Sequence, residues 1–321
     1  MEGVSVLSLA DKLRTEADAY KFLEELRWNG EPVCPHCDTD RAPYFLNPAN
    51  GESRKTRTGS ASQRRVWKCA GCRKQFSVLT GTVFHGSKIP VRTWVFVVFE
   101  MCSSKNGVSA REIERKYDLT PKTAWFMLHR LREAMKREPL AGLLSGRVVA
   151  DETWIGGNPR NRHGGTVGGK GGQGQTDKTP VLSLVSRDTG EIRSRVVPTV
   201  KGTNLRAVMD AELDKATTHL HTDSGSGYTK LGREYASHST VDHKRREYVR
   251  DDVSTNQAEA YFSQLKRSLD GTHHHVSKKH LARYLTEFDF RFSTRNLTDT
   301  DRMRLLGRQV GERRLTYRPP V

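Results

Sequence analysis

The stretch Val148-Val-Ala-Asp-Glu-Thr-Trp154 decides the fold class of this chain. Its β-branched and small apolar residues predict a strand that ends at Asp151. A second run of this kind, His219-Leu-His-Thr-Asp223, also ends on an aspartate, and Ser-Gly-Ser-Gly follows it. A carboxylate that ends a strand and precedes small residues can present a metal ligand at the edge of a sheet. The two runs therefore predict a sheet with a candidate site at one edge.

Strands and helices alternate around these two runs. The further predicted strands are 180–185, 192–197 and 236–241, and the predicted helices are 204–216 and 256–269. The order β-β-β-α-β-β-α predicts an α/β or α+β domain with a mixed sheet. Nine glycines between residues 156 and 174 predict an irregular excursion after the first strand.

The helix predicted for 256–269 carries a third carboxylate. Its polar face holds Asn256, Glu259, Ser263 and Lys266. Together with Asp151 and Asp223, Glu259 completes the three carboxylates that a pair of Mg²⁺ or Mn²⁺ ions needs from protein in a phosphoryl-transfer site. Each residue also has a simpler interpretation, because an aspartate at a strand end commonly caps a turn and a helical glutamate commonly faces solvent. Their order on strand, strand and helix favours the metal site.

Four of the five cysteines form two pairs, Cys34-x-x-Cys37 and Cys69-x-x-Cys72. Two such pairs in series predict one structural Zn²⁺ bound by four thiolates. The 31 residues between the pairs exceed the usual spacing, and a basic loop at 52–65 accounts for the extra length. Two disulfides or chance pairing are the alternatives, and the absence of a secretory signal disfavours disulfides. Cys102, in an apolar helical stretch, is predicted to be a buried thiol.

Basic residues surround the second cysteine pair, and they are Arg64, Arg65, Lys68, Arg73 and Lys74. A small zinc module with these side chains would bind DNA phosphates or bases. A zinc module that only supports its neighbours remains the alternative.

Residues 107–132 have the length and polarity of a helix-turn-helix. Apolar residues such as Ile113 and Leu128 would close its core. This leaves Lys122, Thr123, His129, Arg130 and Arg132 for the recognition helix and its flanks. An ordinary helical hairpin would give the same periodicity.

The charge of the chain points to a polyanionic partner. Its 321 residues include 54 Lys and Arg against 37 Asp and Glu, a formal net charge of +17, and nucleic acid is the commonest intracellular polyanion. The longest apolar run, 94–99, is far shorter than the roughly 18 residues that span a membrane, and the N-terminus lacks the pattern of a signal peptide. We therefore expect a cytoplasmic protein with no membrane partner.

In combination, these motifs resemble those of the bacterial and archaeal insertion-sequence transposases, which join an N-terminal zinc ribbon and helix-turn-helix to an RNase H-like DDE domain. The resemblance rests on the two cysteine pairs, Thr80-Gly-Thr-Val-Phe84, Asp151-Glu-Thr-Trp-Ile-Gly-Gly157, His221-Thr-Asp223 and the segment from Asn256-Gln-Ala-Glu259 through Lys266-Arg267 to Gly271-Thr-His-His-His-Val-Ser277. It implies an RNase H-like fold and metal-dependent cleavage and strand transfer at the ends of a mobile element.

Carried over residue by residue, the resemblance places the catalytic acids at Asp151, Asp223 and Glu259, with two Mg²⁺ or Mn²⁺ ions per site. Lys266 would bind substrate phosphate with Arg267 beside it. Asn256 competes with Glu259 as the third ligand, and Glu152 could replace or assist Asp151.

The resemblance also implies an order of domains: a helical segment at 1–28, a zinc ribbon at 29–86, a helix-turn-helix at 87–140, the DDE domain at 145–296 and a basic tail at 297–321. The implied partners are double-stranded DNA, as terminal inverted repeats and target, and further copies of the chain in the DNA complex, at the nucleoid of a prokaryote. A catalytically inactive DNA-binding regulator descended from such an enzyme is the alternative. An RNase H-like nuclease shares the acids but does not need two DNA-reading modules.

Overall fold

The computed structural model describes residues 3–46, 63–136, 142–156, 178–225, 227–242, 245, 247, 249–250 and 252–316. Most of the predicted glycine-rich excursion and of the basic loop at 52–65 lies outside these residues. The chain divides into two compact units. Unit 1 comprises Met1–Ser104, Val108–Met135 and Asn296–Val321, and unit 2 comprises Lys105–Gly107 and Lys136–Arg295. Within the described ranges, no helix is long and apolar enough to cross a bilayer.

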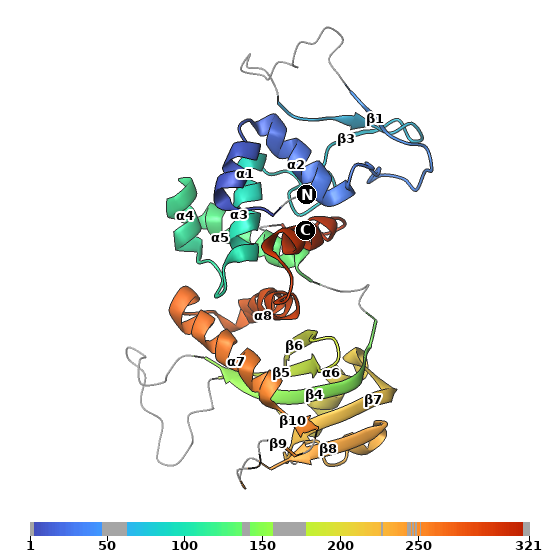
Figure 1. Ribbon diagram of the computed structural model, residues 1–321, viewed down its shortest axis with the longest axis vertical. Helices are drawn as coiled ribbons and strands as arrows, with labels where there is room; N and C mark the ends of the chain where they lie inside the picture. The colour runs from blue at the N-terminus through green and yellow to red at the C-terminus, as the bar shows by residue number, and fades with distance from the viewer. Residues whose placement is uncertain are drawn as a thin grey trace. The chain divides into compact units, whose positions relative to one another are not determined.

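Unit 1 combines helices with a small antiparallel sheet (Figure 1). Its elements are α1 (Val6–Lys12), α2 (Glu16–Trp28), β1 (Tyr44–Phe45), β2 (Trp67–Lys68), β3 (Gln75–Phe76), α3 (Val91–Ser103), α4 (Ala110–Tyr117), α5 (Pro121–Ala134) and α9 (Asp299–Arg308). Helix α2 begins after Thr15, which forms a capping box with Asp18, and ends where Asn29 adopts a left-handed conformation with φ of 51°. Local sequence signals therefore set both of its ends.

Helix α9 packs against α2 and α3. Its buried face includes Met303 and Leu306, and a Cβ at Gly307 would come within 2.8 Å of Leu26 Cβ. Further along, Val83 N donates to Val310 O at 3.1 Å. The basic segment after residue 296 thus contributes an apolar face to the core of unit 1.

Unit 2 contains the predicted mixed sheet. Its strands are β4 (Leu144–Ile155), β5 (Thr179–Ser186), β6 (Ile192–Val196), β7 (Leu213–Asp223) and β8 (Ser237–Val241), in the spatial order β6-β5-β4-β7-β8. Strands β4, β5 and β6 pair antiparallel, whereas β7 runs parallel to β4 and β8 runs parallel to β7. A hairpin of β9 (Val249–Arg250) and β10 (Val253–Ser254) follows. The predicted fold class, an α/β domain with a mixed sheet and helices, is confirmed.

Helices cover both faces of this sheet. Helices α7 (Asn256–Ser268) and α8 (Lys278–Ser293) lie on one face (Figure 1), where Val149 and Phe262 share a buried cluster. Helix α6 (Gly202–Glu212) lies on the other face, where Val148 packs with Met209. Successive residues of β4 therefore point alternately toward α7 and toward α6.

Two helices of unit 2 differ from the prediction. Helix α6 ends at Glu212 instead of continuing to residue 216, because Leu213 begins β7 and pairs with Leu144 of β4. Parallel pairing with a buried strand outweighs the helical periodicity of this segment. Helix α8 was not identified from the sequence, although Leu285 and Phe288 bury a complete face of it.

An enclosed carboxyl group joins α8 to α7 and the sheet. Asp289 accepts hydrogen bonds from Ser194 N at 2.7 Å, from Ser194 Oγ at 2.8 Å and from the Tyr261 hydroxyl at 2.7 Å. Burial raises the pKa of Asp289 to about 6, although these hydrogen bonds oppose the shift.

We expect Asp289→Asn to change how stability depends on pH. The pKa of Asp289 rises from 3.8 to about 6 on folding, so the folded state binds this proton more tightly. That contribution is present below about pH 4 and is lost as the pH rises through about 6. Between about pH 4 and pH 8 the unmodified protein should lose about 2 kcal/mol of stability relative to the variant. Urea unfolding of both proteins across this range measures the difference, and a constant difference would contradict the expectation.

Candidate active site and zinc centre

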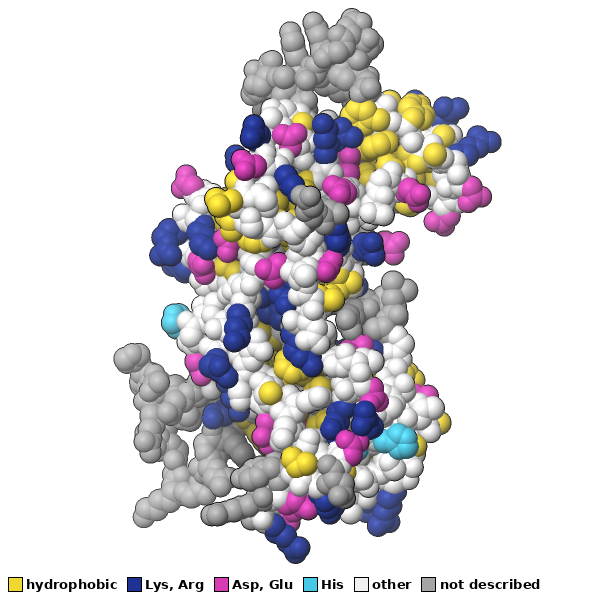
Figure 2. Space-filling model, in the orientation of Figure 1, with side chains coloured by type: hydrophobic (Ala, Val, Ile, Leu, Met, Phe, Trp, Pro, Cys, Tyr) yellow, Lys and Arg dark blue, Asp and Glu magenta, His cyan; other side chains and the backbone are white. Residues whose placement is uncertain are grey.

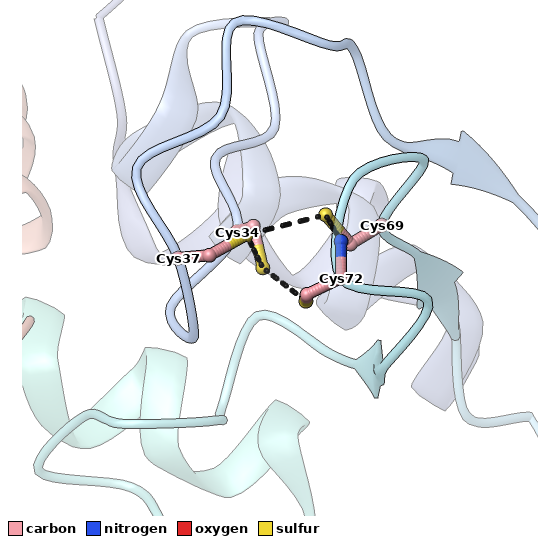
Figure 3. A group of neighbouring side chains, drawn as sticks. All are labelled: Cys34, Cys37, Cys69 and Cys72. Atoms are coloured by element: carbon pink, nitrogen blue, oxygen red, sulfur yellow. Dashed lines mark hydrogen bonds between the residues drawn. The ribbon is translucent and has the colours of Figure 1, made fainter.

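The four paired cysteines meet at one point of unit 1 (Figure 3). Their Sγ atoms all lie within 4.8 Å of one another, and Cys34 and Cys69 are buried. The Sγ–Sγ distance is 3.7 Å for Cys34 and Cys72 and 3.6 Å for Cys37 and Cys69. Zn–S bonds of about 2.3 Å in a tetrahedron place the sulfurs about 3.8 Å apart, whereas a disulfide needs about 2.05 Å. The quartet therefore fits one Zn²⁺ and holds no disulfide.

The backbone around the quartet suits thiolates. His36 N donates to Cys34 Sγ and Cys72 N donates to Cys69 Sγ, each at 3.4 Å. A hydrogen bond with Cys72, followed by burial, raises the pKa of Cys37 to about 12. Although burial opposes the shift, hydrogen bonds from the backbone N–H groups of Cys72 and Gly71 lower the pKa of Cys69 to about 6. Zinc binding displaces protons from thiols such as Cys37, so zinc affinity depends on pH.

Two interior strands of the sheet, β4 and β7, carry the predicted aspartates. Asp223 ends β7 as predicted, but Asp151 lies within β4, because pairing with β5 extends that strand to Ile155. The parallel register pairs Val149 with His221, so Asp151 and Asp223, two residues further on, stand level on neighbouring strands. Both lie on the face covered by α7, because Val149 packs on that face. Asp151 Oδ1 accepts from Glu152 N at 2.8 Å, and Asp223 Oδ1 accepts from Gly225 N at 2.9 Å.

Glu152 lies on the opposite face of β4. Its Oε1 accepts a hydrogen bond from the hydroxyl of Tyr228, a residue only 2% exposed. Burial, together with the negative charges of Asp151 and Asp223, raises the pKa of Glu152 to about 7. The three carboxyl groups therefore share one region of negative potential on β4 and β7.

The third predicted acid lies on the first turn of α7. Glu259 and Asn256 are exposed, whereas Ala258 packs toward the sheet. Helix α7 contacts β4, the strand that carries Asp151. Glu259 and Lys266 are seven residues apart and therefore lie on nearly the same line along the helix.

The acids do not converge as tightly as the cysteines. Over the described ranges, the cysteine quartet is the only group of three or more candidate ligands whose atoms lie within 4.8 Å of one another. Among the described residues, the three predicted acids are therefore not gathered into such a group.

A cleft of about 240 Å³ adjoins the end of β4. Its lining includes the charged, imidazole and indole side chains of Trp154, Lys178, Lys266, Asp270, His274 and His275. Two lysines and two histidines face a single carboxylate, so the cleft suits an anion. Arg267 is exposed next to Lys266 but does not line the cleft.

The basic residues of the zinc module have two different roles. Arg64, Arg73 and Lys74 are exposed. Arg65 Nε instead donates to Glu24 Oε2 at 2.8 Å, and the guanidinium lies 4.3 Å from the Phe45 ring centroid. The Arg65 side chain, 20% exposed, therefore holds the module against α2, a role that the sequence did not predict.

Helices α4 and α5 form the predicted helical pair. Asp118 ends α4 with φ of 49°, and the Thr120 side chain caps α5 at the backbone N–H of Thr123. Lys122 is exposed at the start of α5 and Thr123 is half-buried.

Arg130, which the sequence assigned to the recognition helix, is buried in the structure. It is 6% exposed, it donates from Nη2 to His85 O, and its guanidinium lies 5.6 Å from the Trp94 ring centroid. His129 and Arg132 are buried as well. The helical periodicity was predicted correctly, but α5 is covered on more than one side, so these three side chains belong to the core of unit 1 and do not face DNA.

Sequence reasoning missed Tyr228 and Lys178. Tyr228 follows a glycine-rich turn. The residues next to it in the sequence give no sign that its hydroxyl donates a hydrogen bond to Glu152 of β4. Lys178 directly follows residues that were interpreted only as an excursion.

On the face drawn in Figure 2, lysines and arginines are interspersed with aspartates and glutamates and do not gather into a single stripe.

Comparison with known proteins finds two family models. A transposase zinc-ribbon domain of the IS1595 type matches residues 14–75, and an ISXO2-like transposase domain matches residues 143–293. The first match contains all four clustered cysteines, and the second contains Asp151, Asp223 and Glu259.

A relative and a solved structure are also similar. A protein described as uncharacterized in the transposable element ISH50 of Halobacterium salinarum is 28% identical over 287 residues, which cover 86% of this chain and 90% of that protein. The catalytic core domain of BIV integrase matches with a TM-score of 0.31 at 16% identity, covering 44% of this chain and 81% of that one.

Proposed function

We propose that this chain is an insertion-sequence transposase with an IS1595-type zinc ribbon and an ISXO2-like transposase domain, and that it cuts DNA at the ends of its element and joins them to target DNA. The observation that carries this proposal is the parallel pairing of β4 with β7, which sets Asp151 and Asp223 level on neighbouring strands. Helix α7, which packs on β4, supplies Glu259 as the third acid.

In this proposal Asp151, Asp223 and Glu259 hold two Mg²⁺ or Mn²⁺ ions. Carboxylate oxygens are the ligands that these cations prefer, and the negative potential that helps to raise the pKa of Glu152 to about 7 supports a cation site there. Asn256 is the alternative third ligand. When bound, the two ions activate the attacking oxygen of water or a 3′-hydroxyl and stabilise the leaving oxygen.

Basic side chains beside the acids would hold the DNA backbone. Lys266 lies on the face of α7 that carries Glu259, and it lines the cleft with Lys178, His274 and His275. Hydrogen bonds and charge from these groups would place a phosphate next to the acids, which is the orienting part of catalysis. Arg267 would extend the same contact along the strand.

The zinc ribbon at 29–86 and the helix-turn-helix at 87–140 would read the terminal inverted repeats, ahead of the catalytic domain at 145–296. One Zn²⁺ would hold the ribbon, and the exposed Arg64, Arg73, Lys74 and Lys122 would contact the duplex. Two element ends must meet for strand transfer, so we propose a homo-oligomer in the DNA complex, formed at the nucleoid of a prokaryotic cell.

Lys122 and Arg130 should separate DNA binding from folding. Lys122→Ala should weaken binding to the element ends and lower the slope of log affinity against log salt by about one, because one phosphate contact is lost. Arg130→Ala should instead lower the melting temperature, since it removes a buried hydrogen bond and leaves a void beside Trp94. Fluorescence anisotropy at several salt concentrations and thermal unfolding measure the two effects. Equal melting temperatures for both variants would contradict the core role of Arg130.

Duplex oligonucleotides that carry the ends of the element test the function. With Mg²⁺ or Mn²⁺ the zinc-loaded protein should nick these ends and join them to a second duplex, and scrambled ends should be neither nicked nor joined. Specific binding without cleavage would identify the DNA-binding regulator instead. Cleavage that ignores the end sequence would identify a nuclease.

A further inference from the structure

A series of hydrogen bonds connects Asp151 and Asp223, and it passes through side chains on the opposite face of the sheet. Asp223 Oδ1 accepts from Gly225 N at 2.9 Å, and Gly225 O accepts from Tyr228 N at 3.2 Å. The Tyr228 hydroxyl then donates to Glu152 Oε1, and Glu152 N donates to Asp151 Oδ1 at 2.8 Å. The path runs from one acid to the other through groups that do not lie on the acids' own face of the sheet.

Packing holds Tyr228 in place within this series of hydrogen bonds. Its side chain is 2% exposed and belongs to the buried cluster with Val148, Leu205 and Leu231 on the α6 side of the sheet. Packing on all sides leaves the ring a single position, so the hydroxyl holds Glu152 where it is. The backbone of the same residue holds the turn that follows Asp223.

Two glycines let the turn after Asp223 pack closely against neighbouring atoms. A Cβ at Gly225 would lie 2.7 Å from Asp223 Oδ1. A Cβ at Gly227 would lie 3.1 Å from Leu205 Cδ1 and 3.3 Å from Val200 O. Glycine at both positions therefore lets the turn fold back onto the carboxylate and onto the α6 side of the sheet.

We propose that Tyr228 is a positioning residue which, through Glu152 on one side and the Gly225 turn on the other, fixes Asp151 and Asp223 in the mutual orientation that a shared metal ion needs. This inference rests on the proposed function of the acids and adds to it a residue that touches neither metal nor DNA. Outer groups that orient metal ligands characteristically change metal affinity or activity by about 10- to 100-fold when they are removed.

Tyr228→Phe removes the hydroxyl and keeps the ring. We expect the Mn²⁺ concentration for half-saturation of the zinc-loaded protein, followed by the electron paramagnetic resonance signal of free Mn²⁺, to rise about 10-fold. The Mg²⁺ concentration for half-maximal end cleavage should rise by a similar factor, and affinity for the element ends without metal should not change.

Tyr235→Phe is the matched control. Tyr235 belongs to the same buried cluster, and its hydroxyl has no hydrogen-bond partner among the described residues. Tyr235→Phe therefore removes a hydroxyl from the same buried cluster without breaking the hydrogen bonds that connect Asp151 and Asp223. The Mn²⁺ concentration for half-saturation should equal that of the unmodified protein. Gly225→Ala serves as a second variant, because it disturbs this series of hydrogen bonds from the side of Asp223 and should also weaken Mn²⁺ binding.

Equal Mn²⁺ half-saturation in Tyr228→Phe and Tyr235→Phe would overturn the positioning role. A parallel loss of Mn²⁺ binding in both variants would overturn it too, since the effect would then come from packing in the cluster. Failure of the proposed function looks different: in that case Asp223→Asn would bind Mn²⁺ as well as the unmodified protein, and no metal would support cleavage in any variant.

Discussion

Asp223→Asn should abolish Mg²⁺-dependent end cleavage and strand transfer, lowering both rates by several orders of magnitude. Asparagine has nearly the shape of aspartate, so Gly225 N keeps an acceptor and the turn after β7 is retained. The negative charge is lost, however, and a neutral amide is a poor partner for a pair of divalent cations. Because catalysis at such a site depends on metal-held oxygens, the loss should fall on the chemical step.

Single-turnover assays on duplexes that carry the element ends measure this effect. Binding of the same duplexes without metal should be unchanged or slightly tighter, since one negative charge near the DNA is removed. Asp214→Asn is the matched control, because Asp214 lies on the same strand at its other end and, among the described residues, accepts from the neighbouring Ala216 N and Thr217 Oγ1. This control should cleave at the rate of the unmodified protein.

If Asp223→Asn still carried out strand transfer, Asp223 would not be part of the catalytic site. The three-acid assignment would then fail at its best-placed member, because Asp223 and Asp151 are the pair that the parallel register brings together. Loss of activity in Asp214→Asn as well would point to a general loss of folding, which the melting temperature of each variant reports separately.

Elements were predicted well where local signals and tertiary packing agree. The capping box of Thr15 and Asp18 and the strand alternation around Val149 are both visible in the sequence alone, whereas the prediction that this strand ends at Asp151 is wrong, because β4 continues to Ile155. Helix α6 could not be bounded in this way, because the segment from Leu213 has helical periodicity yet finds a strand partner in Leu144, 69 residues earlier. Pairing between distant segments leaves no local signal.

The residues of the candidate site also differ in how far the local sequence reveals their roles. Cysteine spacing was sufficient to predict the zinc quartet, because each pair reaches a metal through local geometry. A basic side chain on an amphipathic helix, in contrast, does not reveal how many sides of the helix are covered, and Arg130 therefore looked like a DNA contact although it is buried. The role of Tyr228 depends on which residue of β4 lies opposite its hydroxyl, and that follows only from the register of the sheet.

Cys69→Ser should eliminate bound zinc and unfold the ribbon. Cys69 is fully buried and its Sγ accepts from Cys72 N, so a serine there leaves three thiolates around the ion and an ill-fitting hydroxyl. The ribbon strands β1, β2 and β3 have two residues each, too few to hold a sheet by themselves. Zinc binding and folding are therefore one equilibrium in this module.

The loss should extend to helix α2. Glu24, at 8% exposure, accepts hydrogen bonds from Arg65 Nε at 2.8 Å and from Trp67 Nε1 at 2.9 Å, and Trp28 packs edge-on against Trp67 and Phe76. An unfolded ribbon removes both hydrogen-bond partners of this carboxylate and uncovers the Trp28 ring. Loss of the buried apolar contact and of the ion pair destabilises α2, so the melting temperature of unit 1 should fall.

Elemental analysis should find one zinc per chain in the unmodified protein and none in Cys69→Ser, with loss of the tryptophan near-ultraviolet circular dichroism signal from Trp28 and Trp67. Cys102→Ser is the matched control, because it makes the same substitution at a buried cysteine of α3 outside the quartet. It should cost some stability yet keep the full zinc content. One zinc per chain in Cys69→Ser would show that the metal does not depend on four thiolates, and would place the stability of the ribbon in its contacts with Glu24 and Trp28 instead.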